Sequence, residues 1–149
     1  MTIYTAGIME RFNADSIVYI FYFNGNDNNK TWAYAYPVFS TVNENYWQNE
    51  VILLNCGNPS YIMKAGTVAH ELLHTFGLPD MYYANERITQ AYVDYLGNIN
   101  SDEIMFGHAN WDYYDIQPHF TELDAYYLGL TSYSEDLYEW GLGSDIFCN

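Results

Sequence analysis

Residues 70–80 of this 149-residue chain read HELLHTFGLPD, and this stretch carries most of the information about the fold. Residues four apart on an α-helix are separated by about 40° of rotation and about 6 Å of rise. His70 and His74 can therefore present both imidazoles to one metal ion from one face of a helix. Glu71 lies about 60° from His74 in projection, near enough to address a water molecule at the metal without being a ligand.

The spacing indicates a catalytic zinc site. Zinc with three protein ligands keeps one position open, and water held there has a pKa of about 7. Glu71 can accept the proton as that metal-activated water attacks a carbonyl. HExxH sequences also arise by chance, but a histidine buried in a core does not explain two histidines at this spacing with a glutamate between them.

Two sources for a third ligand stay open. Gly77 lets the chain turn sharply, because glycine accepts positive φ without strain, and the turn can bring Asp80 back to the metal. In a thermolysin-like arrangement the acid would come from a later helix, where Asp94 and Glu86 are the nearest candidates. We expect Asp80, since a short side chain suits a ligand presented by nearby backbone.

The run HExxHxxGxxD resembles the metzincin zinc endopeptidases, whose pattern is HExxHxxGxxH followed by a Met-turn. With Asp80 in the third position, it is similar to the snapalysin and immune inhibitor A types of secreted bacterial metalloproteases. The resemblance extends over about residues 66–130 and is specific only at the motif. It implies that His70, His74 and Asp80 bind zinc and that Glu71 is the general base.

Residues 102–107, which read DEIMFG, are similar to a Met-turn. The resemblance implies that Met105 lies beneath the metal as an apolar floor; ordinary core packing is the alternative. Many metzincins place a tyrosine two residues after this methionine, where this chain has Gly107. His108, Tyr113 and Tyr114 are the nearby candidates for stabilising an oxyanion.

An α+β fold is expected. Continuous β-branched and aromatic runs predict strands, and apolar residues at three- and four-residue spacing with capping residues predict helices. The strands are expected at 16–23, 32–39 and 51–54, and the helices at 61–76, 85–96, 121–128 and 134–140. The first helix would have Ser60 as its N-cap and bury the face that includes Ala65, Leu73 and Phe76.

The resemblance implies one metalloprotease catalytic domain over residues 1–149, with a zincin fold of two lobes. A twisted mixed sheet with the active-site helix would occupy about 1–77, and a smaller, mostly irregular and helical lobe would occupy about 78–149. Residues 1–15 have no room for both the strand and the long helix that open most metzincins. Pro37 confines the strand at 32–39 to a sheet edge, where an extended peptide substrate can pair.

The charge of the chain limits its partners. Nineteen Asp and Glu face four Lys and Arg, for a net charge of −15, which repels nucleic acid and anionic membranes and favours cationic peptides and metal ions. No apolar run approaches the roughly 18 residues that span a bilayer. We expect a monomer without membrane insertion, secreted with its leader removed.

Several other residues have two interpretations. Cys56 and Cys148 form one disulfide or stay two thiols. The runs Asn24–Asn29 and Asn98–Glu103 are candidate structural calcium sites, but neither fits the EF-hand pattern, which favours solvated turns. His119 is expected to be structural.

The pattern as a whole predicts a zinc-dependent endopeptidase. A non-catalytic binding module with a structural metal site is one alternative, although such a site has no need of Glu71 and usually has four protein ligands. A zinc hydrolase of non-peptide amides is the other, and only substrates distinguish it.

Overall fold

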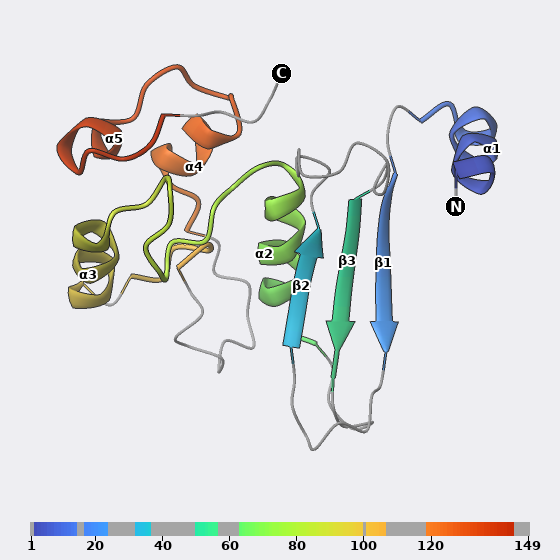
Figure 1. Ribbon diagram of the computed structural model, residues 1–149, viewed down its shortest axis with the longest axis horizontal. Coiled ribbons are helices and arrows are strands. Elements are labelled where there is room, and N and C mark those ends of the chain that lie inside the picture. The colour runs from blue at the N-terminus through green and yellow to red at the C-terminus, as the bar shows by residue number, and fades with distance from the viewer. Residues whose placement is uncertain are drawn as a thin grey trace. The chain divides into compact units, whose positions relative to one another are not determined.

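The chain mixes helices with a small three-stranded sheet (Figure 1). The structure is a computed structural model, and it describes residues 2–14, 17–23, 32–36, 50–56, 63–99, 101–106 and 119–144. The chain divides into two compact units, Met1–Met63 and Lys64–Asn149. The expected single catalytic domain, with its lobe boundary near residue 77, stays a prediction.

The first unit contains the sheet, in the order β1-β3-β2. Strand β1 (Val18–Phe23) pairs parallel with β3 (Glu50–Asn55), and β2 (Trp32–Tyr36) pairs antiparallel with β3. The side chains of Val51, Ile52 and Leu54 on the central strand are buried. The three predicted strands are confirmed, and so is the position of the second at a sheet edge.

The start of the chain forms a helix that the sequence pattern did not predict. Helix α1 spans Thr2–Phe12, next to the N-terminus in Figure 1. It carries little apolar patterning, and its residue Phe12 is exposed. The absence of a buried stripe explains why helical periodicity gave no signal here.

A tyrosine hydroxyl ties the end of the first unit to the sheet. The Tyr22 hydroxyl accepts hydrogen bonds from the Cys56 thiol at 2.7 Å and from the backbone N–H of Met63 at 3.1 Å. Cys56 is a free, buried thiol; Cys148 lies outside the described residues. Met63 and Lys64 are not helical.

Helix α2 consequently begins later than predicted, and spans Ala65–Thr75. Lys64, in an extended conformation, is its N-cap, so the assignment of Ser60 as the cap is wrong. The predicted apolar face is also only partly correct. Leu73 packs against the core of the second unit as predicted, but Phe76 is half exposed. The two histidines of the helix bond to the loops that follow it.

Three shorter helices complete the second unit. Helix α3 spans Gln90–Asn98, α4 spans Glu122–Tyr127 and α5 spans Glu135–Glu139. The prediction placed the start of α3 too early, because Asn85 instead uses its side chain to accept from the N–H groups of Arg87 and Ile88 in a turn. Thr121 and Asp124 form the predicted capping box of α4.

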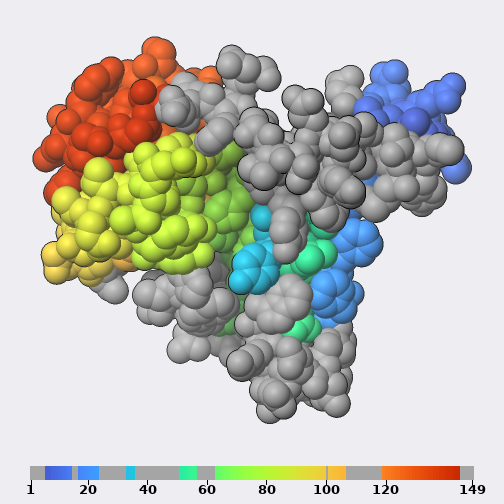
Figure 2. Space-filling model, in the orientation of Figure 1, coloured from blue at the N-terminus to red at the C-terminus, as the bar shows by residue number. Residues whose placement is uncertain are grey.

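The core of the second unit joins these helices to the loops between them. The loops and helices after α2 pack closely together in the yellow-green to red part of Figure 2. Fully buried side chains come from the loop after α2, from α3 and α4 and from the loop before α4; they include Met81, Ile88, Met105, Leu123 and Tyr127. Among the described helices none is long and apolar enough to cross a membrane.

Candidate metal centre

Helix α2 places His70 and His74 one turn apart, and backbone carbonyls fix both rings. The Nδ1 of His70 lies 2.9 Å from the carbonyl oxygen of Ile104, and the Nδ1 of His74 lies 2.8 Å from that of Leu78. A carbonyl only accepts, so each Nδ1 carries the hydrogen and each neutral ring has a bare Nε2. This is the arrangement by which proteins orient histidines for metal binding.

The turn after α2 brings Asp80 to the same place. Gly77 has a φ of 97°, as expected for a sharp exit from the helix. Asn85 donates a side-chain hydrogen bond of 2.8 Å to the carbonyl of Asp80, and the next N–H, that of Met81, donates to the carbonyl of Met105 at 3.1 Å. The backbone on both sides of the Asp80 side chain is therefore anchored.

Three ligand atoms converge as a result. The Oδ1 of Asp80 lies 3.1 Å from the Nε2 of His70 and 3.1 Å from the Nε2 of His74, and the two nitrogens lie 3.2 Å apart. Tetrahedral zinc with ligands at about 2.0–2.1 Å separates any two of them by about 3.3 Å. The triangle is slightly tighter than that and fits one ion of this size.

The chemistry of the three atoms calls for a cation. With each Nδ1 protonated, the neutral histidines present lone pairs to each other and to a carboxylate. Such a set repels itself unless a proton or a metal ion lies among the three atoms. Of the described residues, only His70, His74 and Asp80 form a group of three or more potential metal ligands.

The electrostatics of the group follow from this proximity. Burial raises the pKa of Asp80, but when the imidazoles of His70 and His74 are protonated and no metal is bound, their hydrogen bonds and charge outweigh burial and hold the pKa of Asp80 well below its ordinary value. Burial lowers the pKa of His74, but the hydrogen bond and charge of Asp80 raise it more, so the net shift is upward. Asp80 is thus a carboxylate at neutral pH, as a ligand must be.

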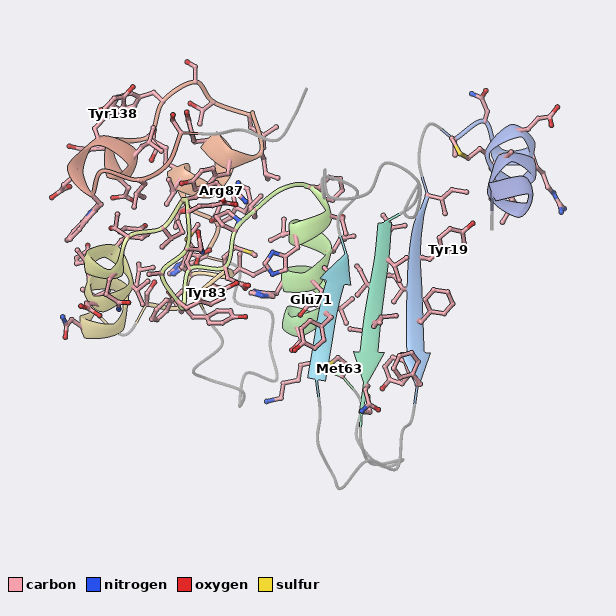
Figure 3. The ribbon with its side chains drawn as sticks, in the orientation of Figure 1. Tyr19, Met63, Glu71, Tyr83, Arg87 and Tyr138 are labelled. Carbon is pink, nitrogen blue, oxygen red and sulfur yellow. The ribbon has the colours of Figure 1, made fainter. Side chains whose placement is uncertain are left out.

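Glu71 lies on the same helix, labelled in Figure 3, and is 7% exposed. It is outside the group of three converging atoms. Its charge nevertheless contributes to the raised pKa values of His74 and Tyr82, so it lies within electrostatic reach of the group. This is the placement expected of a base that addresses water and not the metal.

Tyr82 is a neighbour that the sequence analysis did not single out. Its ring stacks on His70 with centroids 6.1 Å apart, and its hydroxyl hydrogen-bonds to Asp80. Burial first, and then the charge of Asp80, raise the pKa of Tyr82, so the hydroxyl stays protonated and able to donate. The only feature of the sequence that pointed to Tyr82 is its position two residues after Asp80, and in a chain with 17 tyrosines that position alone did not distinguish it.

The loop at residues 101–106 supports the group of His70, His74 and Asp80 through its backbone carbonyls. It supplies the carbonyl of Ile104 to His70 and that of Met105 to Met81. The Met105 side chain is fully buried in the core. Its predicted role as an apolar floor stays a prediction, but the loop that carries it does position ligands.

Replacing Met105 by leucine is expected to be mild. The swap roughly conserves apolar volume, so the free energy of unfolding should fall by less than about 1.5 kcal/mol, whereas Met105→Ala should cost about 2–5 kcal/mol. Chemical denaturation of the three proteins measures both. Loss of bound zinc from Met105→Leu at unchanged stability would show that the methionine does more than fill space.

The remaining candidate residues lie elsewhere. Asp94 is exposed and accepts from Gln90, and Glu86 is exposed; neither belongs to the converging group. His119 is exposed and bonds to Asp102. His108, Tyr113, Tyr114 and the run Asn24–Asn29 lie outside the described residues.

The interpretation of Asn98–Glu103 as a solvated turn is wrong for its last residue. The Glu103 side chain is 1% exposed, and its carboxyl group accepts from the backbone N–H groups of Met105 and Phe106 at 2.7 and 2.6 Å. These bonds repay part of the cost of burying a carboxyl group. Asp102 and Glu103 thus both have partners within the protein.

Comparison of the chain with protein-family models, with curated proteins and with solved structures finds no match in any of the three. The geometry of the metal group and the resemblance of its motif are therefore what a functional proposal rests on.

Proposed function

We propose that this protein is a secreted zinc-dependent endopeptidase with a metzincin-like fold. The observation that carries the proposal is the convergence of two imidazole nitrogens and one carboxylate oxygen within 3.1–3.2 Å, with both Nδ1 atoms bonded to backbone carbonyls. Two neutral histidines and one carboxylate are the ligand set of thermolysin and carboxypeptidase A, which cleave peptide bonds.

The residues around the group have complementary tasks in such a reaction. A bound zinc ion supplies a Lewis acid that makes water nucleophilic at neutral pH. Glu71 accepts the proton of the attacking water and passes it to the leaving amine. The hydroxyls of Tyr82 and Tyr83, both hydrogen-bonded to Asp80, are the described candidates that would turn to donate to a developing oxyanion.

Two alternatives use the same metal group. In a non-catalytic binding module the metal would be a structural prop, and metal binding would not require the carboxyl group of Glu71. A zinc hydrolase of non-peptide amides would use the same residues on a different substrate. Neither is favoured by a specific contact in the structure.

Metal analysis combined with a peptide-library cleavage assay tests the proposal. We expect about one zinc per chain and cleavage within peptides, abolished by a chelator and restored by zinc. Zinc binding without cleavage of any peptide would support a structural site, and cleavage confined to non-peptide amides would support the second alternative.

The net charge of −15 should steer cationic substrates toward the protein. We expect kcat/KM for a cationic peptide to fall with added salt more steeply than for a neutral peptide of the same cleavage sequence, because screening shortens electrostatic reach to about 8 Å at physiological ionic strength. Measuring both peptides across a salt series checks this. Parallel salt curves would remove steering from the mechanism.

A further inference from the structure

Two acidic side chains lie buried together beside the metal centre's supporting loop. Glu103 is 1% exposed and Asp124, on α4, is fully buried. Their carboxyl groups lie close enough to interact electrostatically and to hydrogen-bond if one of them carries a proton. Two carboxylates cannot form such a bond, since each offers only lone pairs.

Each carboxyl group also accepts two other hydrogen bonds, and both oxygens of Glu103 accept from the loop, so the place of the proton depends on the one carboxyl oxygen of the pair that has no other donor. Thr121 donates to Asp124 Oδ2 twice, from its backbone N–H at 2.7 Å and from its hydroxyl at 2.9 Å, which favours the ionised form of Asp124. The second oxygen, Oδ1, is buried and has no other donor. A proton on Glu103 supplies that donor.

We propose that Glu103 and Asp124 share one proton, and that Glu103 is thereby a positioning residue for the metal group. With the proton between them, Glu103 is hydrogen-bonded to Asp124 of α4, while its oxygens accept from the N–H groups of Met105 and Phe106. The loop so fixed presents the Ile104 carbonyl to His70 and the Met105 carbonyl to the residue after Asp80. The part of this inference that concerns zinc rests on the proposed function; the shared proton does not.

The electrostatic surroundings agree with this assignment. Burial, followed by the charge of Asp124, raises the pKa of Glu103 to about 9. Other titratable groups also lie near the pair. The charges of Glu103 and Asp124 both contribute to the raised pKa of Tyr92 on α3, and the Tyr92 hydroxyl donates a hydrogen bond to Asp136 of α5. Each of these neighbours adds negative charge or none, so none of them favours ionisation of Glu103.

The shared proton makes stability depend on pH. The unfolded chain releases the Glu103 proton near its ordinary pKa of 4.5, while the folded chain keeps it until about 9. Between these values the folded state binds more protons, so rising pH favours unfolding, by up to about tenfold in the equilibrium constant per pH unit. Above the folded pKa this contribution is flat.

The variant Glu103→Gln removes the titratable proton and keeps a side chain of nearly the same size and shape. Glutamine does not titrate; its amide NH2 can donate to Asp124 and its oxygen can accept from one of the two loop N–H groups that now donate to Glu103. We expect urea unfolding of this variant, metal-free and full length, to lose the slope that wild type shows between about pH 5 and 9. Glu122→Gln, an exposed position on α4, is the matched control and should keep the wild-type slope.

Infrared spectroscopy reads the proton directly. Wild type and Glu122→Gln should show the carbonyl band of a buried protonated carboxylic acid at pH 7, and Glu103→Gln should lack it. Absence of that band from wild type, with equal pH slopes for wild type and Glu103→Gln, would overturn the shared proton.

Zinc affinity tests the positioning role. Glu103→Gln should bind zinc within about threefold of wild type, while Glu103→Ala should bind about tenfold or more weakly, the usual loss when a ligand's support is removed. Equal affinity in Glu103→Ala would overturn positioning. Should wild type show the acid band and bind no zinc, the proposed function fails and the shared proton stands.

Discussion

Replacement of Glu71 by glutamine is expected to leave zinc bound and to lower kcat for peptide hydrolysis by about 10²–10⁴-fold, the usual contribution of a positioned general base. The reason is the division of tasks at the site. Glu71 lies on α2 beside the converging atoms but is not one of them. Glutamine conserves its size and removes the ability to accept a proton.

The measurement pairs zinc content with single-turnover cleavage of one peptide. Glu122→Gln makes the same chemical change at an exposed position of α4 and should retain full activity. Near-normal turnover by Glu71→Gln with zinc in place would rule out the general-base role. Loss of zinc from that variant would instead make Glu71 a ligand, contrary to the geometry.

Asp80→Asn is expected to have the largest effect on metal binding. Zinc with two neutral imidazoles and one carboxylate carries a net charge of +1, the balance of the His₂Glu enzymes. An amide in place of the carboxylate leaves the full +2 at a site where Asp80 Oδ1 now lies 3.1 Å from both nitrogens. We expect zinc affinity to fall by about 100-fold or more, because a charged ligand and not an outer partner is lost.

Asp94→Asn and Glu86→Gln are the matched controls, since both positions are exposed acids in the next segment of the chain. Zinc content after dialysis against a weak chelator should be unchanged in both and lost in Asp80→Asn. If Asp80→Asn holds its zinc and one of the controls releases it, the metzincin assignment and its fold are both wrong.

The parts of the structure that could be predicted from sequence are those that local chemistry determines. The run at Val18–Phe23 is rich in β-branched and aromatic residues, the run at Glu50–Asn55 has four consecutive aliphatic residues, and both form strands. The capping box at Thr121 and Asp124 formed as expected. The approach of Asp80 to His70 and His74 could be predicted because all three lie within eleven consecutive residues that include one glycine turn, residues 70–80, although Asn85 and Met105 also anchor the backbone there.

The parts that could not be predicted depend on partners far along the chain. Helix α2 begins at Ala65, and Met63, just before it, bonds to Tyr22, 41 positions away. Glu103 is buried because the N–H groups of its own loop donate to its carboxyl group and Asp124 lies beside it. Nothing in the run Asn98–Glu103 distinguishes this residue from a solvated acid. The carbonyls that orient the histidines carry no sequence signal at all, because every residue has one.

The X-ray absorption spectrum of zinc bound to the wild-type chain tests the central claim most directly, because it reads the ligands themselves. The proposed group of His70, His74 and Asp80 should give two imidazole nitrogens at about 2.0–2.1 Å and further oxygen ligands at about 2.0–2.2 Å. Scattering from sulfur at about 2.3 Å, or a chain that takes up no zinc, would contradict it.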